Sequence, residues 1–185
     1  MTDEVIVTLE FTPNPNTLKF VVNRELLKFG AANFTSAEAA KAKSPLGAKL
    51  FGVSGVGAIM IGRNFITITK TEGGDWDLVH EQSRKILQQH LESGETVVEQ
   101  TALNTNTQGG GEVEQKIREI LDNEIRPAVA MDGGDITFDK YEDGVVYLYM
   151  QGACAGCPSS TMTLKMGIEN RLREAIPEIK EVVSI

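Results

Sequence analysis

The chain has 185 residues, of which 41% are hydrophobic and 24% charged, and its formal net charge is −8. This length predicts one or two domains, and no apolar run approaches the ~18 residues that span a bilayer, so we expect no membrane segment. The negative charge lies mainly in residues 112–185, which hold 14 acidic and 8 basic side chains, whereas residues 1–92 hold 10 of each. Acidic surfaces repel phosphate backbones, which argues against nucleic-acid binding.

The first residues argue for a protein that stays in the cytoplasm. Met1–Glu4 lack the basic and apolar segments of a signal peptide, and their acidity is unlike that of an organellar transit peptide. We therefore expect a reducing, cytoplasmic environment. Closely spaced cysteines in such an environment serve metal binding or redox chemistry more often than a structural disulfide.

Residues 1–92 predict an α/β domain. Apolar alternation, turn residues and helical periodicity mark its elements. In chain order we expect a strand at 5–11, a turn rich in proline and asparagine at 12–17, a strand at 18–22, a helix at 36–43 capped by Ser36, a helix at 45–51 opened by Pro45, a hairpin of strands 56–61 and 65–69, and a helix from Asp75 to about Glu92.

Glycines, a tryptophan and two histidines in this domain favour structural roles. Four glycines between 52 and 62 suggest a nucleotide-binding loop, but the third glycine of a GxGxxG pattern would fall on Met60. Trp76 is expected to pack at the start of the last helix. His80 and His90 are ten residues apart on that helix and do not share a face at a spacing of four, so we expect partly exposed residues rather than metal ligands.

A flexible linker is expected at 93–111. Most of this segment is polar, it lacks apolar periodicity, and it ends in three glycines. Such a composition buries too little apolar surface to offset the entropy of ordering. The linker would separate the domain at 1–92 from a second domain at 112–185.

Residues 112–185 predict a compact αββαβ domain. The expected elements are an amphipathic helix from about Glu112 that Pro127 kinks or ends, a strand at 136–141, a hairpin turn at 142–144, a strand at 145–150, a helix running to Pro177, and a strand at 179–185. Because crossover connections are right-handed, this order predicts a small mixed sheet with both helices on one face.

The two cysteines of the chain, Cys154 and Cys157, lie three residues apart in the loop between the second strand and the second helix of this domain. Small residues between them let the backbone curl around a ligand. Pro158 suits a helix start, and Ser159 or Ser160 suits its cap. The positive end of that helix would face the sulfurs, which favours thiolate over thiol.

A second turn, Met131–Asp135, precedes the first strand of this domain. Its two glycines permit positive φ angles, and its aspartates can accept backbone N–H bonds, so a structural turn is the preferred interpretation. Metal ligation by Asp132 or Asp135 is less expected, because iron–sulfur and zinc chemistry at a CxxC pair prefers sulfur.

Three functions fit the cysteine pair. An iron–sulfur cluster needs four thiolates, which two copies of the chain would supply. A dithiol–disulfide redox site also uses CxxC at a helix N-terminus, although the αββαβ order differs from that of thioredoxin. A zinc ion could likewise bridge two chains. The ligand count does not separate iron–sulfur from zinc.

The cysteine loop and its flanking motifs resemble those of the NifU-like domain of Nfu-type iron–sulfur carriers. The resemblance spans residues 112–185 and is carried by Arg126-Pro127, Asp132-Gly133-Gly134-Asp135-Ile136, Gly152-Ala153-Cys154-Ala155-Gly156-Cys157-Pro158-Ser159-Ser160, Thr163-Leu164-Lys165-x-Gly167-Ile168-Glu169 and Ile176-Pro177-Glu178. The first domain resembles the Nfu N-terminal domain through Phe11-Thr12-Pro13-Asn14-Pro15-Asn16-Thr17-Leu18-Lys19-Phe20.

This resemblance implies a carrier rather than an enzyme, with no catalytic residues. A labile [4Fe–4S] cluster would be held between two subunits of a homodimer by Cys154 and Cys157 of each, with a [2Fe–2S] cluster as an alternative. The cluster would come from an upstream scaffold and pass to apo-enzymes by thiolate exchange. The N-terminal domain would dock or position the recipient protein.

Overall fold

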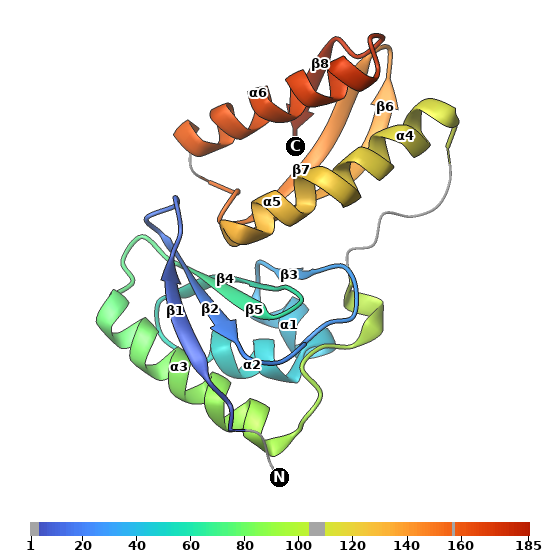
Figure 1. The fold of residues 1–185 in the computed structure, drawn as a ribbon. Helices are drawn as coiled ribbons and strands as arrows, with labels where there is room; N and C mark the ends of the chain where they lie inside the picture. Colours follow the sequence, from blue (N-terminus) through green and yellow to red (C-terminus); the bar gives the residue numbers. More distant parts are fainter. Residues whose placement is uncertain (1–3, 104–109, 157) are drawn as a thin grey trace. The chain divides into compact units, whose positions relative to one another are not determined.

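The computed structural model describes residues 4–103, 110–156 and 158–185. The chain divides into two compact units, Met1–Asn104 and Thr105–Ile185. Each unit combines a β-sheet with helices, which confirms the predicted α/β (α+β) fold class (Figure 1). No helix in the described ranges is long and apolar enough to cross a membrane.

The N-terminal unit is built on a five-stranded antiparallel sheet with the strand order β1-β2-β5-β4-β3. Its elements are β1 (Val7–Phe11), β2 (Thr17–Val22), β3 (Ala32–Phe34), α1 (Ala37–Lys43), α2 (Pro45–Phe51), β4 (Val56–Ile61), β5 (Phe65–Lys70) and α3 (Trp76–Ser93), followed by a short 3₁₀ turn at Gln100–Ala102. The predicted strands and helices are confirmed to within two residues. The three-residue strand β3 was not predicted, because it is too short to show alternation.

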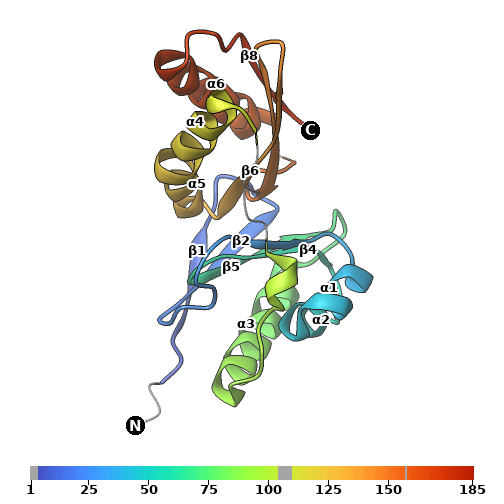
Figure 2. The same cartoon turned by 90° about the vertical axis from the view of Figure 1, so that its right-hand side faces the viewer.

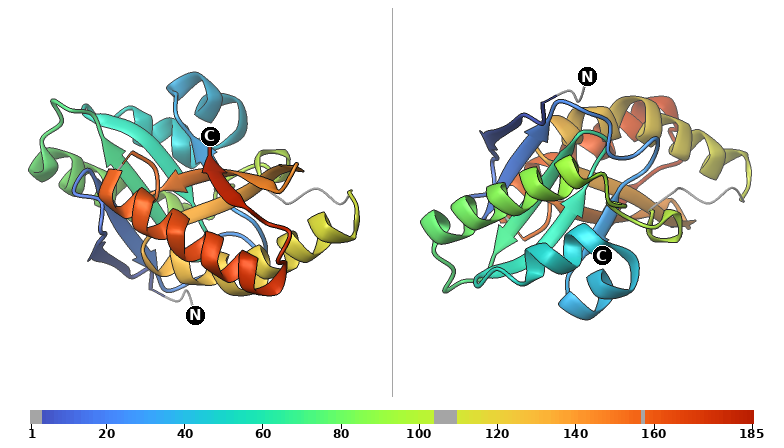
Figure 3. Two further views of the ribbon diagram at one scale, coloured as in Figure 1. Left: turned by 90° about the horizontal axis from the view of Figure 1, so that it is seen from above. Right: turned by 90° about the horizontal axis from the view of Figure 1, so that it is seen from below.

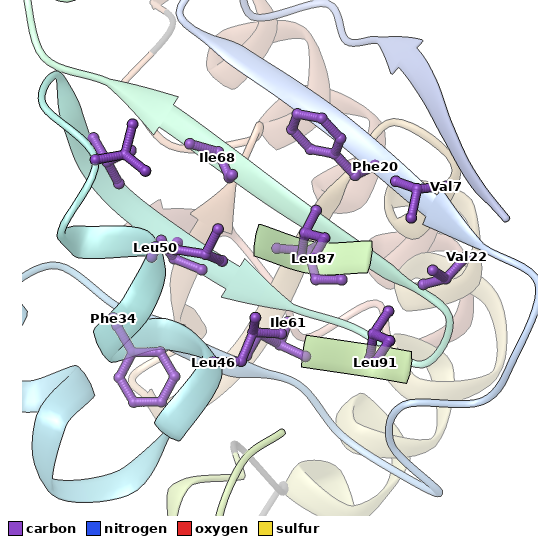
Figure 4. Close-up of a cluster of buried hydrophobic side chains, with 14 of the residues drawn as sticks. Val7, Phe20, Val22, Phe34, Leu46, Leu50, Ile61, Ile68, Leu87 and Leu91 are labelled. Atoms are coloured by element: carbon purple, nitrogen blue, oxygen red, sulfur yellow. The ribbon is translucent and has the colours of Figure 1, made fainter. Parts of the chain in front are cut away.

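The helices of this unit cover one face of its sheet. In Figure 3 (right), α3 and the α1–α2 pair lie in front of the strands. The core between the layers is apolar: Figure 4 shows Leu46, Leu50 and Leu87 against Phe20 and Ile68, all of which are buried. Each alternate strand residue and each third or fourth helix residue points into this layer, as the two periodicities require.

The helix starts follow the sequence signals. The hydroxyl of Ser36 accepts a hydrogen bond from the Ala39 N–H, and the carboxylate of Asp75 accepts one from the Asp77 N–H. The cap predicted at Ser36 and the helix start predicted at Asp75 are therefore confirmed. Ser44 caps α2 directly before Pro45 and also donates its hydroxyl to the Val97 carbonyl at 2.6 Å, which ties a distant segment to the helix start.

His90 is buried, so its predicted partial exposure is wrong. Its Nε2 lies 3.1 Å from the Thr96 carbonyl and its Nδ1 lies 3.1 Å from Lys49 Nζ. A carbonyl can only accept, so Nε2 carries the proton and Nδ1 accepts from Lys49. Burial lowers the pKa of His90, and the charge of Lys49 lowers it further. Sequence periodicity could not anticipate this burial, because the chain after α3 folds back over the helix end.

The segment expected to be a linker differs in its first part. Helix α3 ends with Gly94 in the left-handed conformation, and Val97, Val98 and Leu103 pack against the core of the N-terminal unit. The Glu99 N–H also donates to the Lys43 carbonyl at 2.7 Å. Residues 104–109 of the expected linker lie outside the described residues.

The C-terminal unit has a three-stranded mixed sheet. Its elements are α4 (Glu112–Ile120), a π-helical turn (Leu121–Ile125), α5 (Arg126–Met131), β6 (Gly134–Glu142), β7 (Val145–Gly152), α6 (Pro158–Ala175) and β8 (Glu181–Ser184). Strand β7 pairs antiparallel with β6 and parallel with β8. Figure 2 shows α4, α5 and α6 on one side of this sheet, so the predicted αββαβ topology and shared helix face are confirmed.

Pro127 neither ends nor simply continues the first helix of this unit. Proline has no N–H to donate, so the regular α-helical hydrogen bonding is interrupted before it. A π-helical turn at Leu121–Ile125, which is wider than an α-helical turn, lies between α4 and α5. The predicted hairpin turn is tight: Asp143 and Gly144 have φ angles of 52° and 88°, as a two-residue turn between twisted antiparallel strands requires.

Candidate functional site

The loop that carries the cysteines begins where β7 ends. Gly152, the last residue of β7, pairs with Gly134, the first residue of β6, and both lie next to the turn that ends α5. The Ala153 N–H donates to the Gly133 carbonyl at 3.0 Å, which joins the loop to this turn. The cysteine loop therefore forms one structure with the turn at Asp132-Gly133-Gly134-Asp135 (the DGGD turn), which lies some twenty residues earlier in the sequence.

Cys154 has a fixed position in the core of the unit. Only 6% of its surface is exposed, and its N–H donates to the Gln151 carbonyl at 3.3 Å. The Thr161 hydroxyl, from α6, donates to the Cys154 carbonyl at 3.1 Å. Strand end and helix start thus both hold the backbone of this cysteine, while Cys157 lies outside the described residues.

Gly134 provides the space that the sulfur of Cys154 occupies. A Cβ atom built on Gly134 would lie 2.1 Å from Cys154 Sγ, far inside van der Waals contact. The φ angle of Gly134 is not positive, so close approach rather than backbone conformation requires glycine here. The first glycine of the motif, Gly133, has a φ of 80° and serves the turn itself.

Arg126, which is partly buried, forms an ion pair with the buried Asp135 beside the loop. Arg126 donates through Nε at 2.8 Å and through Nη2 at 3.0 Å to the two carboxylate oxygens of Asp135, and through Nη1 to Asp122 at 3.0 Å. Burial by itself would lower the pKa of Arg126, but its bonds to Asp135 and Asp122 outweigh that effect and raise it. The pair fastens α5 to the start of β6.

This ion pair corrects the interpretation of the DGGD turn. Asp135 lies in β6 and accepts from a guanidinium, instead of capping backbone N–H groups, and Asp132 ends α5. No local pattern relates Arg126 to Asp135, so sequence reasoning missed the pair. Among the described residues, no group of three or more histidine, cysteine or acidic side chains is arranged to hold a metal ion.

The electrostatics of Cys154 are opposite to the expectation of a stabilised thiolate. Burial raises the pKa of Cys154, and the negative charges of Asp132 and Asp135 raise it further, to about 12. The burial of the sulfur and the two nearby carboxylates raise its pKa by more than the positive end of a helix would lower it. Cys154 is therefore a neutral thiol at physiological pH, and binding of a metal requires the loss of its proton.

Slow alkylation of Cys154 is the expected consequence of this pKa. In a Cys157→Ser variant at pH 8, iodoacetamide should modify Cys154 at least about 100-fold more slowly in the folded protein than in urea, because only the thiolate reacts and its fraction falls tenfold for each pKa unit. The rate should keep rising with pH up to about 12. Since the unfolded chain loses this proton first, folded-state stability should fall as pH rises from about 9 towards 12.

Mass spectrometry of timed samples measures the alkylation rate, with Asp132→Asn as a test of the cause. That substitution removes one of the two carboxylates and should speed the reaction of the folded protein. Equal rates in the folded and unfolded states would contradict the buried, neutral thiol.

Each of the two units matches the model of a known protein family. Residues 117–183 match the family model described as NifU-like domain, and residues 7–94 match the model described as Scaffold protein Nfu/NifU N terminal. A solved structure, the NifU-like protein from Saccharomyces cerevisiae, is 25% identical and aligns with a TM-score of 0.47 over 52% of this chain and 86% of its own.

Two curated relatives are named NFU1 iron-sulfur cluster scaffold homolog, mitochondrial. The protein from Drosophila grimshawi is 43% identical over 94% of this chain, and that from Drosophila persimilis is 40% identical over 98%. The chain spans 59% and 65% of the lengths of these relatives.

The names of these relatives describe them as mitochondrial, which contradicts the cytoplasmic location predicted from the first residues. The matches to the two family models follow one another in the order of the two structural units. The chain therefore belongs to the Nfu family, with an Nfu N-terminal domain followed by a NifU-like domain.

Proposed function

We propose that this protein carries an iron–sulfur cluster, as a [4Fe–4S] unit held between two copies of the chain by Cys154 and Cys157 of each, and delivers it to apo-proteins. The observation that carries the proposal is the position of Cys154, fixed between a strand end and a helix start against Gly134, three residues from the other cysteine of the chain. Two thiols per copy supply half of a four-thiolate shell.

The properties of Cys154 suit a cargo that must be released. A metal competes with protons for a thiolate, so a cysteine whose pKa lies near 12 regains its proton readily once a recipient's thiolate takes its place. The exchange is balanced: the recipient thiol gives up one proton for each bond it forms to iron, and the Cys154 thiolate takes one up. Cluster transfer under this proposal needs no catalytic residue.

The raised pKa also argues against a dithiol–disulfide function in which Cys154 is the attacking thiol. Redox-active CxxC motifs depend on a nucleophilic cysteine with a lowered pKa, and that of Cys154 is raised. A zinc ion shared between two chains would use the same four sulfurs and is a distinct outcome of the test below. The match to a NifU-like domain at residues 117–183 favours iron–sulfur.

The two units of the chain would have different roles in cluster delivery. Residues 112–185 would bind the cluster, and residues 1–92 would dock or position recipient proteins, joined through 93–111. The partners would be a second copy of this chain, an upstream scaffold that supplies the cluster, and apo iron–sulfur proteins that receive it.

Anaerobic reconstitution with iron and sulfide tests this function. We expect about four irons per two chains, a change from monomer to dimer on loading, and a Mössbauer spectrum of a [4Fe–4S] cluster. Native mass spectrometry gives the mass and the metal content together. Two irons per dimer would replace the cluster type by [2Fe–2S], and a tightly bound zinc without iron uptake would overturn the proposal.

A further inference from the structure

Strand β1 lies at the edge of the N-terminal sheet. In the order β1-β2-β5-β4-β3 it pairs with β2 alone among the strands that the structure describes. Figure 1 shows this strand at the border of the sheet. The edge of a sheet presents unpaired N–H and C=O groups in a row, which is a template for an additional strand.

The hydrogen bonds at the start of β1 show which residues face β2. Asn23 donates its N–H to the Ile6 carbonyl at 3.3 Å, and the Ile6 N–H donates to Asn23 Oδ1 at 3.0 Å, so the backbone of Ile6 points toward β2. Val22, which is paired with Val7, instead donates its N–H to the Asn64 carbonyl at 2.9 Å, away from β1. Val7 and Val22 are therefore a pair without mutual hydrogen bonds.

The direction of the backbone N–H and C=O groups alternates from one residue of a strand to the next, so the directions of the remaining groups of β1 follow. Thr8 and Glu10 point their N–H and C=O groups toward β2, like Ile6. Val7, Leu9 and Phe11 present theirs to the open edge. The same alternation puts these three side chains on the helix-covered face, where Figure 4 shows Val7.

A pocket of about 430 Å³ opens beside this edge on the helix-covered face. Its walls include Leu9 and Phe11 from β1, Leu18 from β2, and Trp76, Asp77 and His80 from the first turns of α3. Residues directly opposite each other on neighbouring strands point to the same face. A strand added to β1 would thus direct each residue opposite Leu9 or Phe11 toward this pocket.

The walls of the pocket are held in place before any ligand binds. Trp76 donates its indole N–H to the Pro15 carbonyl at 3.2 Å, and the His80 ring stacks on Phe20 with 6.0 Å between centroids. Phe11, in contrast, is 86% exposed. A preformed apolar pocket next to an exposed aromatic residue lowers the ordering cost of binding and offers apolar area to cover.

The charge beside the pocket indicates the chemistry of its occupant. Asp77 lines the pocket and is exposed, and no lysine or arginine is among the described residues that line it. A lysine or arginine can lay its apolar stem along the apolar wall of the pocket and place its charged head at Asp77.

We infer that the open edge of β1 and this pocket bind an extended segment of a partner protein by β-strand addition. The segment places an apolar side chain over Leu9 and Phe11 and a basic side chain beside Asp77. This site is independent of the cysteines, so it can be tested on metal-free protein, and its failure would leave the proposed cluster chemistry untouched.

Hydrogen exchange of the free, full-length chain tests the open edge. The amides of Thr8 and Glu10 should be protected, while those of Val7, Leu9 and Phe11 should exchange at least about tenfold faster. NMR spectra of ¹⁵N-labelled protein in deuterated buffer measure each amide. Equal protection along β1 would overturn the inference, because the edge would then already be paired.

A displayed library of random peptides of about ten residues, panned on the metal-free chain, tests the site. Selected peptides should alternate apolar residues and include a basic one, and their binding should protect the Leu9 and Phe11 amides. N-methylation of the peptide amides that face β1 should weaken binding at least about tenfold, whereas N-methylation one residue along should change it about twofold or less.

Protein variants test the charge. Asp77→Asn should weaken binding of the selected peptide by about three- to tenfold, and the control Glu81→Gln, one turn further along α3, should leave it unchanged. Fluorescence anisotropy measures both. Failure to enrich any peptide, or a selected peptide that binds without protecting Leu9 and Phe11, would overturn the inference.

Discussion

Cys154→Ser is expected to abolish iron–sulfur binding while the protein stays folded. The substitution removes one of the two thiolates per copy, and a hydroxyl does not replace a thiolate as a ligand for iron. The fold should persist because the core of the C-terminal unit is formed by apolar side chains such as Ile136, Leu148 and Leu172, all fully buried. Iron content after anaerobic reconstitution and circular dichroism measure the two effects separately.

The matched control for this prediction is Ala155→Ser. It places the same hydroxyl one residue further along the loop, at an exposed position, and keeps both thiols. Iron content should remain at the level of the unaltered chain, and Cys157→Ser should behave like Cys154→Ser. Full iron binding by Cys154→Ser would remove Cys154 from the cluster site, and loss of the folded spectrum would show that this cysteine holds the core together.

Gly134→Ala is expected to impair cluster binding without changing a ligand. The new methyl group would lie 2.1 Å from Cys154 Sγ, so the sulfur or the strand must move by more than 1 Å. Overpacking of this kind costs about 1–3 kcal/mol of unfolding free energy. The displaced sulfur no longer matches the geometry that the other ligands impose, so iron uptake should fall severalfold or more.

Two further variants separate this effect from general instability. Gly167→Ala, in α6, has no heavy atom within 4 Å of the added methyl and should stabilise the protein by about 0.5–1 kcal/mol with unchanged iron uptake. Cys154→Ala in the Gly134→Ala background removes the 2.1 Å contact with the sulfur and leaves contacts of 3.1 Å or more, so the two destabilisations should fail to add. Additive free energies in urea titrations would show that Gly134 does not act through Cys154.

Prediction from sequence succeeded where one segment contains the whole signal. The cap at Ser36 needs only its own helix start, and the turn at Asp143 and Gly144 needs only its two strands. Prediction was incomplete where distant segments decide: Thr96 covers His90, which we expected at the surface. The strand at Ala32–Phe34 is defined only by its partner, β4.

The candidate site shows the same division. The spacing of Cys154 and Cys157 between a strand and a helix is a local property, and the sequence by itself determined it, together with the αββαβ order. Only the tertiary structure decided the state of the sulfur. It brings Asp132, Asp135 and Gly134 against Cys154, and the resulting burial and negative charge raise the pKa that helix position alone was expected to lower. Burial and charge depend on residues that the fold brings together from separate segments, which no spacing along the chain specifies.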